Sequence, residues 1–220
     1  MFDRILRGAA VYLDRRMLGL LALGYSSGFP FLLKYSTLSF WLLDEGVNIK
    51  SVALFASTGT PYALKFLWAP LLDRVPIPGL SRIFGIRRSW LIALQLALMG
   101  SIIGVAYANP GEDLWQTALA VMIMATLSAS QDVVIDAYRV ELLDDDEQGA
   151  GAAAAVFGYR LGMLVAGAGA LYLAAALGAH GLTDGAAWAL TYLAMAPCLL
   201  VGVVATLSMP EPVRERASTA

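Results

Sequence analysis

The sequence predicts an all-α integral membrane protein with six transmembrane helices. Of its 220 residues, 59% are hydrophobic and only 15% are charged, and the mean hydropathy is +0.67. A soluble domain of this size needs far more polar surface. Long apolar runs recur along the chain and are continuous, whereas transmembrane strands alternate over about 10 residues, so we expect helices.

Six segments are apolar enough and long enough to cross a bilayer, which takes about 20 residues in a helix. The predicted spans are residues 17–43, 51–72, 89–108, 115–140, 150–178 and 187–209. Residues 1–16 are interpreted as a short amphipathic arm on the membrane surface, and residues 210–220 as a tail. The first apolar run is longer than the apolar core of a signal peptide, so we expect no cleavable leader.

The basic residues outside the spans predict the orientation, because loops on the cytoplasmic side carry the excess of Lys and Arg. One side holds almost all of them: Arg4, Arg7, Arg15, Arg16, Arg74, Arg82, Arg87, Arg88, Arg139, Arg214 and Arg216. The loops on the opposite side hold only Lys50. Both termini are therefore expected in the cytoplasm. The tryptophans lie within a few residues of predicted span ends, as in an interfacial belt.

Composition also excludes several classes of function. The chain has one cysteine, Cys198, and one histidine, His180, so neither a disulfide framework nor a Cys/His metal cluster is expected. The sequence offers no Ser/His pair suited to catalysis, and we expect no enzyme, no cofactor and no metal. A net charge of −2 says little about partners, and no nucleic acid is expected among them. The lipid bilayer is the partner that the composition implies.

Charged residues inside the predicted spans are the main candidates for function. A carboxylate at the centre of a membrane helix costs about 3 kcal/mol on insertion scales, so it needs a partner, water or a function. Counted at about 1.5 Å per residue from the cytoplasmic ends, Lys65, Asp132 and Arg160 lie at a similar depth. Together with Lys34 in the outer half, they would line a mildly basic cavity that suits an anionic solute.

Structural explanations of these charges stay open. Asp132 and Arg160 would also serve as an ion pair that fixes helix packing, and Lys65 is long enough to snorkel to the headgroups. Asp132 is also a candidate proton acceptor. Asp136 lies one turn closer to the cytoplasmic surface, where water or Arg139 would satisfy it and where a structural or gating role is expected.

Small residues form a second pattern. They recur at every fourth position of the fifth span: Ala154, Gly158, Gly162, Ala166 and Ala170. Such a stripe permits close contact between helices. In the first span, Pro30 follows Gly24 and Gly28 and is expected to bend the helix in mid-membrane, because proline removes a backbone hydrogen bond.

The loop after the second span has the sequence WAPLLDRVPIPGLSRIFGIRRSW. An Asp-Arg pair at a helix end, Asp73-Arg74, is followed by a glycine and by the pair Arg87-Arg88. This arrangement resembles the loop between helices 2 and 3 of the major facilitator superfamily, where such ion pairs latch neighbouring helix ends in one state of the transport cycle. The copy departs from that pattern in Ala69, where glycine is usual, and in a longer spacing from Asp73 to Arg87.

Several local strings narrow the resemblance to the AmpG-type muropeptide permeases, which belong to the same group as the acetyl-CoA transporter-like proteins. The strings are SSGFPF, KFLWAPLLDR, SASQDVVIDAYRVELL, GAGAAAAVFGYRLGMLVAG and the closing PEP. The resemblance covers nearly the whole chain, from about Leu18 to Pro212. It implies a proton-coupled importer of GlcNAc-anhydro-MurNAc and its peptide forms, which works in the bacterial inner membrane and serves cell-wall recycling.

The resemblance also implies which residues form the site. Asp132 of SASQD and Arg160 of GYRLG are carried over first. Lys65 of KFLW and Asp73 of LLDR follow. Neighbours of these charges would supply hydrogen bonds or stack on a sugar: Ser130, Gln131 and Tyr159.

The chain corresponds to only part of such a permease. These transporters resemble two six-helix halves, each made of two inverted three-helix repeats, with the substrate site between the halves. The six predicted spans correspond to the N-terminal half. Three interpretations stay open, in which the chain is truncated, pairs with a second half, or forms a homodimer. The stripe of the fifth span is expected on the face that is left uncovered.

Three functions stay open as well. The first is half of a secondary transporter that couples the import of anionic cell-wall fragments to protons. The second is a related carrier for another anionic solute, such as an acyl-CoA or a peptide. The third is a membrane subunit without transport activity that assembles with a second half. Replacement of Asp132 by Asn discriminates, because a proton-coupled carrier should lose gradient-driven uptake and a scaffold should tolerate the change.

Overall fold

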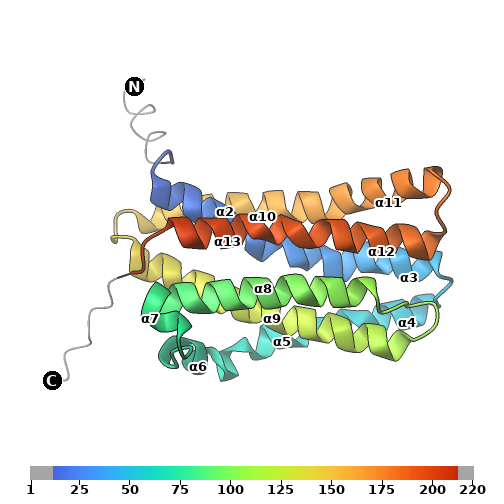
Figure 1. Cartoon of the computed structure of the whole chain (residues 1–220), viewed down its shortest axis with the longest axis horizontal. Helices are drawn as coiled ribbons and strands as arrows, with labels where there is room; N and C mark the ends of the chain where they lie inside the picture. The colour runs from blue at the N-terminus through green and yellow to red at the C-terminus, as the bar shows by residue number, and fades with distance from the viewer. Residues whose placement is uncertain (1–11, 213–220) are drawn as a thin grey trace.

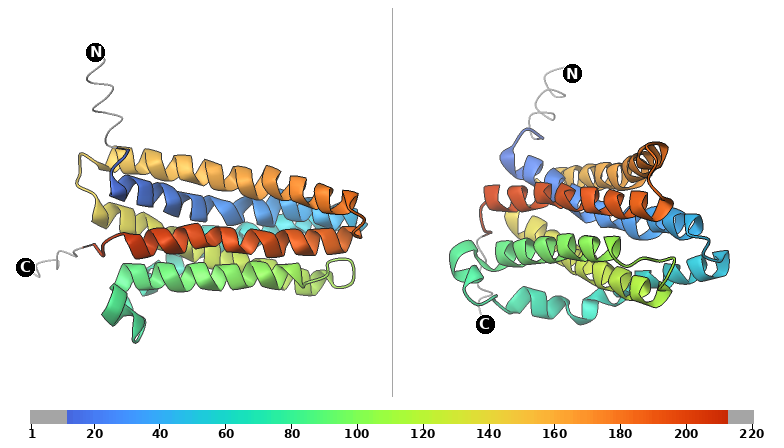
Figure 2. Two further views of the ribbon diagram at one scale, coloured as in Figure 1. Left: turned by 45° about the horizontal axis from the view of Figure 1, so that its top comes forward. Right: turned by 45° about the vertical axis from the view of Figure 1, so that its right-hand side comes forward.

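The structure, a computed structural model, describes residues 12–212, and every regular element in this range is a helix. The helices run back and forth in an elongated bundle (Figure 1 and Figure 2). The all-α prediction is therefore confirmed for the described part of the chain. The predicted arm, residues 1–16, and the predicted tail, residues 210–220, lie mostly outside the described residues.

Five helical runs are long and apolar enough to cross a membrane, judged by length and composition. They are Arg15–Asp44, Ile86–Ala106, Leu114–Leu142, Gln148–Ala179 and Asp184–Ser208. The second and third of these runs are single α-helices, α8 (Ile86–Ala106) and α9 (Leu114–Leu142). The protein is therefore built to cross the membrane several times.

The other three runs each contain one short turn of different helical pitch. The first run consists of α2 (Arg15–Leu32), the π-helical turn Leu33–Thr37 and α3 (Leu38–Asp44). The fourth consists of α10 (Gln148–Leu164), the π-helical turn Val165–Gly169 and α11 (Ala170–Ala179). The fifth consists of α12 (Asp184–Met195), the 3-10 turn Ala196–Leu199 and α13 (Leu200–Ser208). The first π-helical turn closely follows Pro30, which lies inside α2 and lacks one N–H of the helical ladder. Such turns often accompany functional sites.

The predicted second span, residues 51–72, is helical but divided, and it is not among the five long runs. Its pieces are α4 (Ile49–Leu54), the 3-10 turn Phe55–Gly59, α5 (Thr60–Leu64), the 3-10 turn Lys65–Leu67 and α6 (Ala69–Arg74). Pro61 and Pro70 lie in the first turns of α5 and α6, where the missing N–H costs no bond within the helix. The prolines thus start new helices and break up the segment.

The described chain begins and ends at the same end of the bundle, where α2 starts and α13 finishes (Figure 1). We call this the terminal end; the short α7 (Leu80–Phe84) also lies there (Figure 1). The opposite end, where α3 and α11 finish, is the far end. The segment from α4 to α6 runs back along the bundle from the far end to the terminal end (Figure 1).

Helices α2 and α10 are in close contact because glycines of each helix lie against the backbone of the other. A Cβ atom on Gly158 would overlap the backbone carbonyl of Leu21, and one on Gly28 would overlap that of Tyr159. The alanines of the same stripe are buried too: Ala154, Ala166 and Ala170. The prediction that this stripe lies on an uncovered face was wrong, because α2 supplies a matching row of small residues and covers it.

Candidate functional site

Asp132 lies on the face of α9 that is turned toward α2. Its carboxylate accepts a hydrogen bond from Ser27 Oγ at 2.6 Å, and its side chain is partly buried. The charged groups that interact with it electrostatically come from three elements: Lys34, Lys65 and Asp136. The interior of this apolar bundle therefore holds one carboxylate close to two ammonium groups.

Lys34 is buried, with 1% of its surface exposed, and its Nζ atom has no hydrogen-bond partner among the described residues. The ammonium lies over three aromatic rings, at centroid distances of 5.5 Å for Phe31, 4.2 Å for Tyr35 and 3.8 Å for Tyr62. We call these rings the Lys34 cage. Cation–π contacts contribute about 0.5–2 kcal/mol each, which offsets part of the cost of burying a charge.

The divided segment 49–74 is attached to α9 on both sides of Lys65. Tyr62 Oη donates to Ser128 Oγ at 2.7 Å, and Trp68 Nε1 donates to Ser130 Oγ at 3.0 Å. Lys65 lies in the 3-10 turn between these two contacts and is half-buried. The hydrogen bonds thus keep the Lys65 side of this segment against the helix that carries Asp132.

Arg160 is exposed on α10, and within residues 12–212 no ion pair joins it to Asp132. Gly158 and Gly162 contact α2, and a residue two positions away on a helix lies about 200° around the axis. The side of α10 that carries Arg160 is therefore turned away from α2. The structure brings Lys65 and Lys34 to Asp132 but leaves Arg160 on the outer surface.

The three polar neighbours expected in the cavity have different surroundings. Gln131 is fully buried and donates from Nε2 to the backbone carbonyl of Ser26 at 3.0 Å, so it joins α9 to α2. Ser130 is buried and accepts the Trp68 hydrogen bond. These contacts are between helices and do not turn either side chain toward a cavity. Tyr159 is half-buried, and its ring lies 6.2 Å from that of Phe31.

A charged network joins helix ends at the terminal end. The buried Arg87 guanidinium donates to Asp73 Oδ1 at 2.6 Å and binds both carboxylate oxygens of Glu141, at 2.9 and 2.6 Å. We call these three residues the terminal latch. It joins α6, α8 and α9, three elements that are separate in the sequence. Two-pronged pairing of a guanidinium with a carboxylate is among the stronger hydrogen-bonding arrangements in proteins.

Arg88 binds a different partner from Arg87. Its guanidinium donates to the backbone carbonyls of Thr206 and Leu207 at the end of α13, at 2.9 and 3.0 Å. Glu211 completes this corner by accepting hydrogen bonds from the backbone N–H groups of Arg87 and Arg88, at 2.8 and 3.0 Å. The carboxylate caps α8 in place of a local side chain, because Gly85 at the N-cap has none.

Two further residues of the expected latch, besides Arg88, lie outside the terminal latch. Arg74 and Asp136 are exposed, and neither makes a hydrogen bond or ion pair within residues 12–212 that involves the terminal latch. Arg139 donates to Gln148 Oε1 at 3.0 Å. Asp136 interacts with Asp132 electrostatically, one turn along α9.

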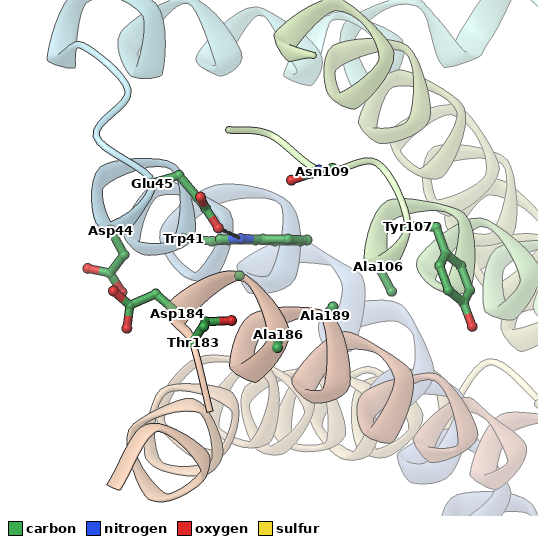
Figure 3. A pocket seen from close by; sticks show the side chains of 11 residues that line it. Trp41, Asp44, Glu45, Ala106, Tyr107, Asn109, Thr183, Asp184, Ala186 and Ala189 are labelled. Atoms are coloured by element: carbon green, nitrogen blue, oxygen red, sulfur yellow. Dashed lines mark hydrogen bonds between the residues drawn. The ribbon is translucent and has the colours of Figure 1, made fainter. Parts of the chain in front are cut away.

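A cavity of about 590 Å³ lies at the far end and is lined by acidic and aromatic side chains (Figure 3). Its carboxylates already accept bonds from indole N–H groups: Glu45 Oε1 from Trp41 at 3.2 Å and Asp44 Oδ2 from Trp188 at 2.8 Å. Asp184 lies beside Asp44 in the same lining. In the part of the chain that the structure describes, no group of three or more His, Cys, Asp or Glu is arranged to hold a metal ion.

Comparison with known proteins places this geometry in a family. The family model described as acetyl-coenzyme A transporter 1 matches residues 16–176, which include the Lys34 cage, Asp132 and the terminal latch. The chain belongs to this transporter family. It is therefore a multi-pass membrane protein of a transporter family, and its helices are surrounded by the lipid bilayer.

Individual relatives agree with the family assignment. The anhydromuropeptide permease of Escherichia coli K12 is 45% identical over 195 residues, which is 88% of this chain and 37% of the permease. A Rickettsia conorii protein named "Putative transporter AmpG 4" is 36% identical over 96% of this chain and 50% of its own length. The predicted resemblance to AmpG-type permeases is thus confirmed, and the chain spans half or less of each of these two relatives.

Several residues of these clusters are absent from the sequence-predicted site. They are Ser27, Tyr62, Glu141 and Glu211. Three of them lie in strings that carry the family resemblance, namely SSGFPF, SASQDVVIDAYRVELL and PEP, so a signal for them was present. Tyr62 lies in none of these strings, and only its contacts reveal it.

Proposed function

We propose that the chain is one six-helix half of a proton-coupled transporter that imports anhydromuropeptides across the bacterial inner membrane. The observation that carries the proposal is 45% identity, over 88% of the chain, to the protein named anhydromuropeptide permease. The charges inside the bundle support it, because ionisable residues within membrane spans mark ion and substrate paths. Asp132, Lys34 and Lys65, one acidic and two basic residues, give a formal net charge of +1, which suits an anionic cargo.

We infer that the divided segment 49–74 is the sixth membrane crossing. It runs from the far end to the terminal end, and an even number of crossings brings the two ends of the described chain to one side (Figure 1). The excess of arginine near that end favours the cytoplasm. Six crossings with both ends on one side suit half of a major facilitator superfamily fold, made of two inverted three-helix repeats.

We propose that Asp132 is the proton acceptor of the coupling step. Its carboxylate has one hydrogen-bond donor, Ser27, and two ammonium groups close by, so its charge has a large effect on the local field. Protonation removes the negative charge and leaves the lysines to attract an anion. Moving an uncharged carboxyl group through the bilayer interior is cheaper than moving a charged one.

A second six-helix unit is proposed to close the other side of the cavity. The chain spans 37% of the E. coli permease and 50% of the R. conorii relative, and transporters of this kind bind cargo between two halves. Arg160 supports this, since an exposed guanidinium on a membrane helix is costly unless it faces water or protein. The second unit is the continuation of a longer protein, a separate chain or a second copy of this one.

The terminal latch is proposed to hold the cytoplasmic end closed in this conformation. Arg87 joins the ends of three elements through Asp73 and Glu141. Opening of that end would separate α6 from α8 and α9, and the latch would have to break. The latch would form again when that end closes. It therefore stabilises the conformation described here relative to the other states of the transport cycle.

A carrier of acyl-CoA is the second candidate, and the description of the family model favours it. Coenzyme A esters are anionic, and Lys34 and Lys65 suit them as well. A subunit that assembles without transport is the third candidate, and only a functional assay separates it from the other two.

The test is uptake by sealed vesicles that hold the 220-residue chain, with and without a co-produced C-terminal half of the E. coli relative. Radiolabelled GlcNAc-anhydro-MurNAc-peptide and acetyl-CoA are compared under an inward proton gradient. Gradient-dependent uptake of the muropeptide supports the proposal, and uptake of acetyl-CoA alone favours the second candidate. If neither compound is taken up although both preparations contain folded protein, the result favours the third candidate, a subunit without transport activity.

A further inference from the structure

We propose that Lys34 is the residue that binds the anionic group of the cargo, and that Tyr62 is the gate that covers it. This inference rests on the proposed transport function and names the group inside the bundle that selects for an oxyanion. In a muropeptide the oxyanion is a carboxylate. The inference starts from the one buried cation in the described part of the chain that has no hydrogen-bond partner.

The Lys34 ammonium has three N–H donors, and none of them has an acceptor among the described residues. Only 1% of the residue is exposed, so bulk water does not replace the missing acceptors. The rings of the Lys34 cage stabilise a cation by their faces but accept no strong hydrogen bond. A buried ammonium in this condition favours any oxyanion that reaches it.

The nearby carboxylate does not satisfy Lys34. Asp132 interacts with Lys34 electrostatically, but no ion pair within the described residues joins them, and the hydrogen bond of Asp132 comes from Ser27 at 2.6 Å. The other charges that act on Asp132 are Lys65 and Asp136. No described residue thus accepts a hydrogen bond from the Lys34 ammonium, and the cargo of the proposed transporter is the molecule that would supply the acceptor.

Tyr62 is the ring placed most closely over Lys34, with its centroid 3.8 Å from the ammonium nitrogen. It lies on α5, a helix of five residues with 3-10 turns on both sides. Its hydroxyl is attached to the bundle by one side-chain hydrogen bond, to Ser128. A short helix between two turns moves as a unit more easily than part of a continuous helix, because few hydrogen bonds of the ladder must break.

Movement of α5 away from α9 would uncover Lys34 next to two neighbouring aromatic rings, which are tilted relative to each other. Phe31 and Tyr159 have centroids 6.2 Å apart, and both belong to the α2–α10 pair, which the glycines hold firmly. Aromatic faces of this kind are suited to the apolar face of a sugar ring. The fixed side of the site would thus hold the sugar, and Lys34 would hold its carboxylate.

The experiment measures binding of two disaccharide probes to the 220-residue chain in lipid nanodiscs by titration calorimetry. One probe is GlcNAc-anhydro-MurNAc, whose lactyl carboxylate is free, and the other is its methyl ester. The wild-type chain is expected to bind the acid about tenfold more tightly, the effect of one charge-assisted hydrogen bond. Lys34→Met should abolish this preference and leave the affinity for the ester unchanged.

Matched variants isolate the charge of Lys34. Lys34→Arg keeps a cation and should retain part of the preference, and Lys50→Met removes an exposed lysine at the far end and should retain all of it. Lys34→Gln replaces Lys34→Met if circular dichroism shows that the methionine variant is unfolded. If Lys34→Met or Lys34→Gln still binds the acid more tightly than the methyl ester, the inference is overturned and the transport proposal stays intact. A wild-type chain that binds neither probe, either alone or with the co-produced C-terminal half of the E. coli relative, overturns both.

The gate has its own test. Tyr62→Phe keeps the ring over Lys34 but removes the hydrogen bond to Ser128, so the acid should associate several-fold faster in stopped-flow measurements of tryptophan fluorescence. An association rate equal to that of the wild type would show that Tyr62 is not a gate. Thr60→Val removes an exposed hydroxyl of the same helix, which donates only within the segment, and should leave the rate unchanged.

Discussion

Gly158 of α10 lies directly against Leu21 of α2, with no room between the two backbones for a side chain at position 158. The same is true one turn along, where Gly162 meets the backbone of Tyr25. These contacts position the helix with Tyr159 and Arg160 relative to the helix with Ser27 and Lys34. The site is therefore built on a helix pair whose spacing glycine alone permits.

Gly158→Ala is expected to force α2 and α10 apart. Overpacking of a tight contact typically costs about 1–3 kcal/mol, so the midpoint of thermal unfolding in detergent should fall. Gly104→Ala in α8 is the control, because a Cβ atom there meets nothing within 4 Å. Its midpoint should be unchanged or slightly higher. Equal midpoints for the two variants would contradict the packing described here.

Arg87→Met is expected to destabilise the terminal end. The change leaves Asp73 and Glu141 without their shared guanidinium, and the loss of such charged hydrogen bonds costs about 2 kcal/mol. Arg74→Met removes an exposed arginine of the same region and should have little effect. Hydrogen exchange of α6 and the start of α8, followed by mass spectrometry, checks this. Unchanged protection in Arg87→Met would mean that the latch contributes nothing to closure.

Asp132→Asn is expected to reduce gradient-driven uptake to the level seen without a gradient. Exchange of cargo across the vesicle membrane should continue, because Asn is similar in size and keeps an acceptor for Ser27. Asp136→Asn is the matched control, since Asp136 is exposed one turn away on the same helix. Full gradient-driven uptake by the Asp132 variant would remove Asp132 from the coupling step.

Single cysteines should report the orientation of the chain. In a Cys198→Ala background, Lys50→Cys at the far end is expected to react with an impermeant maleimide added to whole spheroplasts. Arg82→Cys, in α7 at the terminal end, should react only after the membrane is opened. Both positions are exposed. Labelling of the two cysteines from the same side would exclude the proposed sixth crossing by segment 49–74.

The sequence by itself determined the class of protein and most of the membrane segments. Hydrophobicity is a property of each residue, and it accumulates over about 20 positions whatever the helix packs against. The same holds for Asp132 and Lys65, because a charge inside an apolar run is conspicuous without any knowledge of its neighbours. The family strings then led to the transporter family, which the comparison with known proteins confirms.

The tertiary structure alone decided how these residues are used. Depth along a helix places Arg160 at the level of Asp132, but the direction of its side chain follows from the packing of Gly158 and Gly162 on α2. Gln131 stands beside Asp132 in the sequence and nevertheless points to Ser26, because successive residues lie about 100° apart around a helix. The cage around Lys34 joins residues from two distant segments. Such contacts depend on which helices pack together, and hydrophobicity along one chain contains no information about that choice.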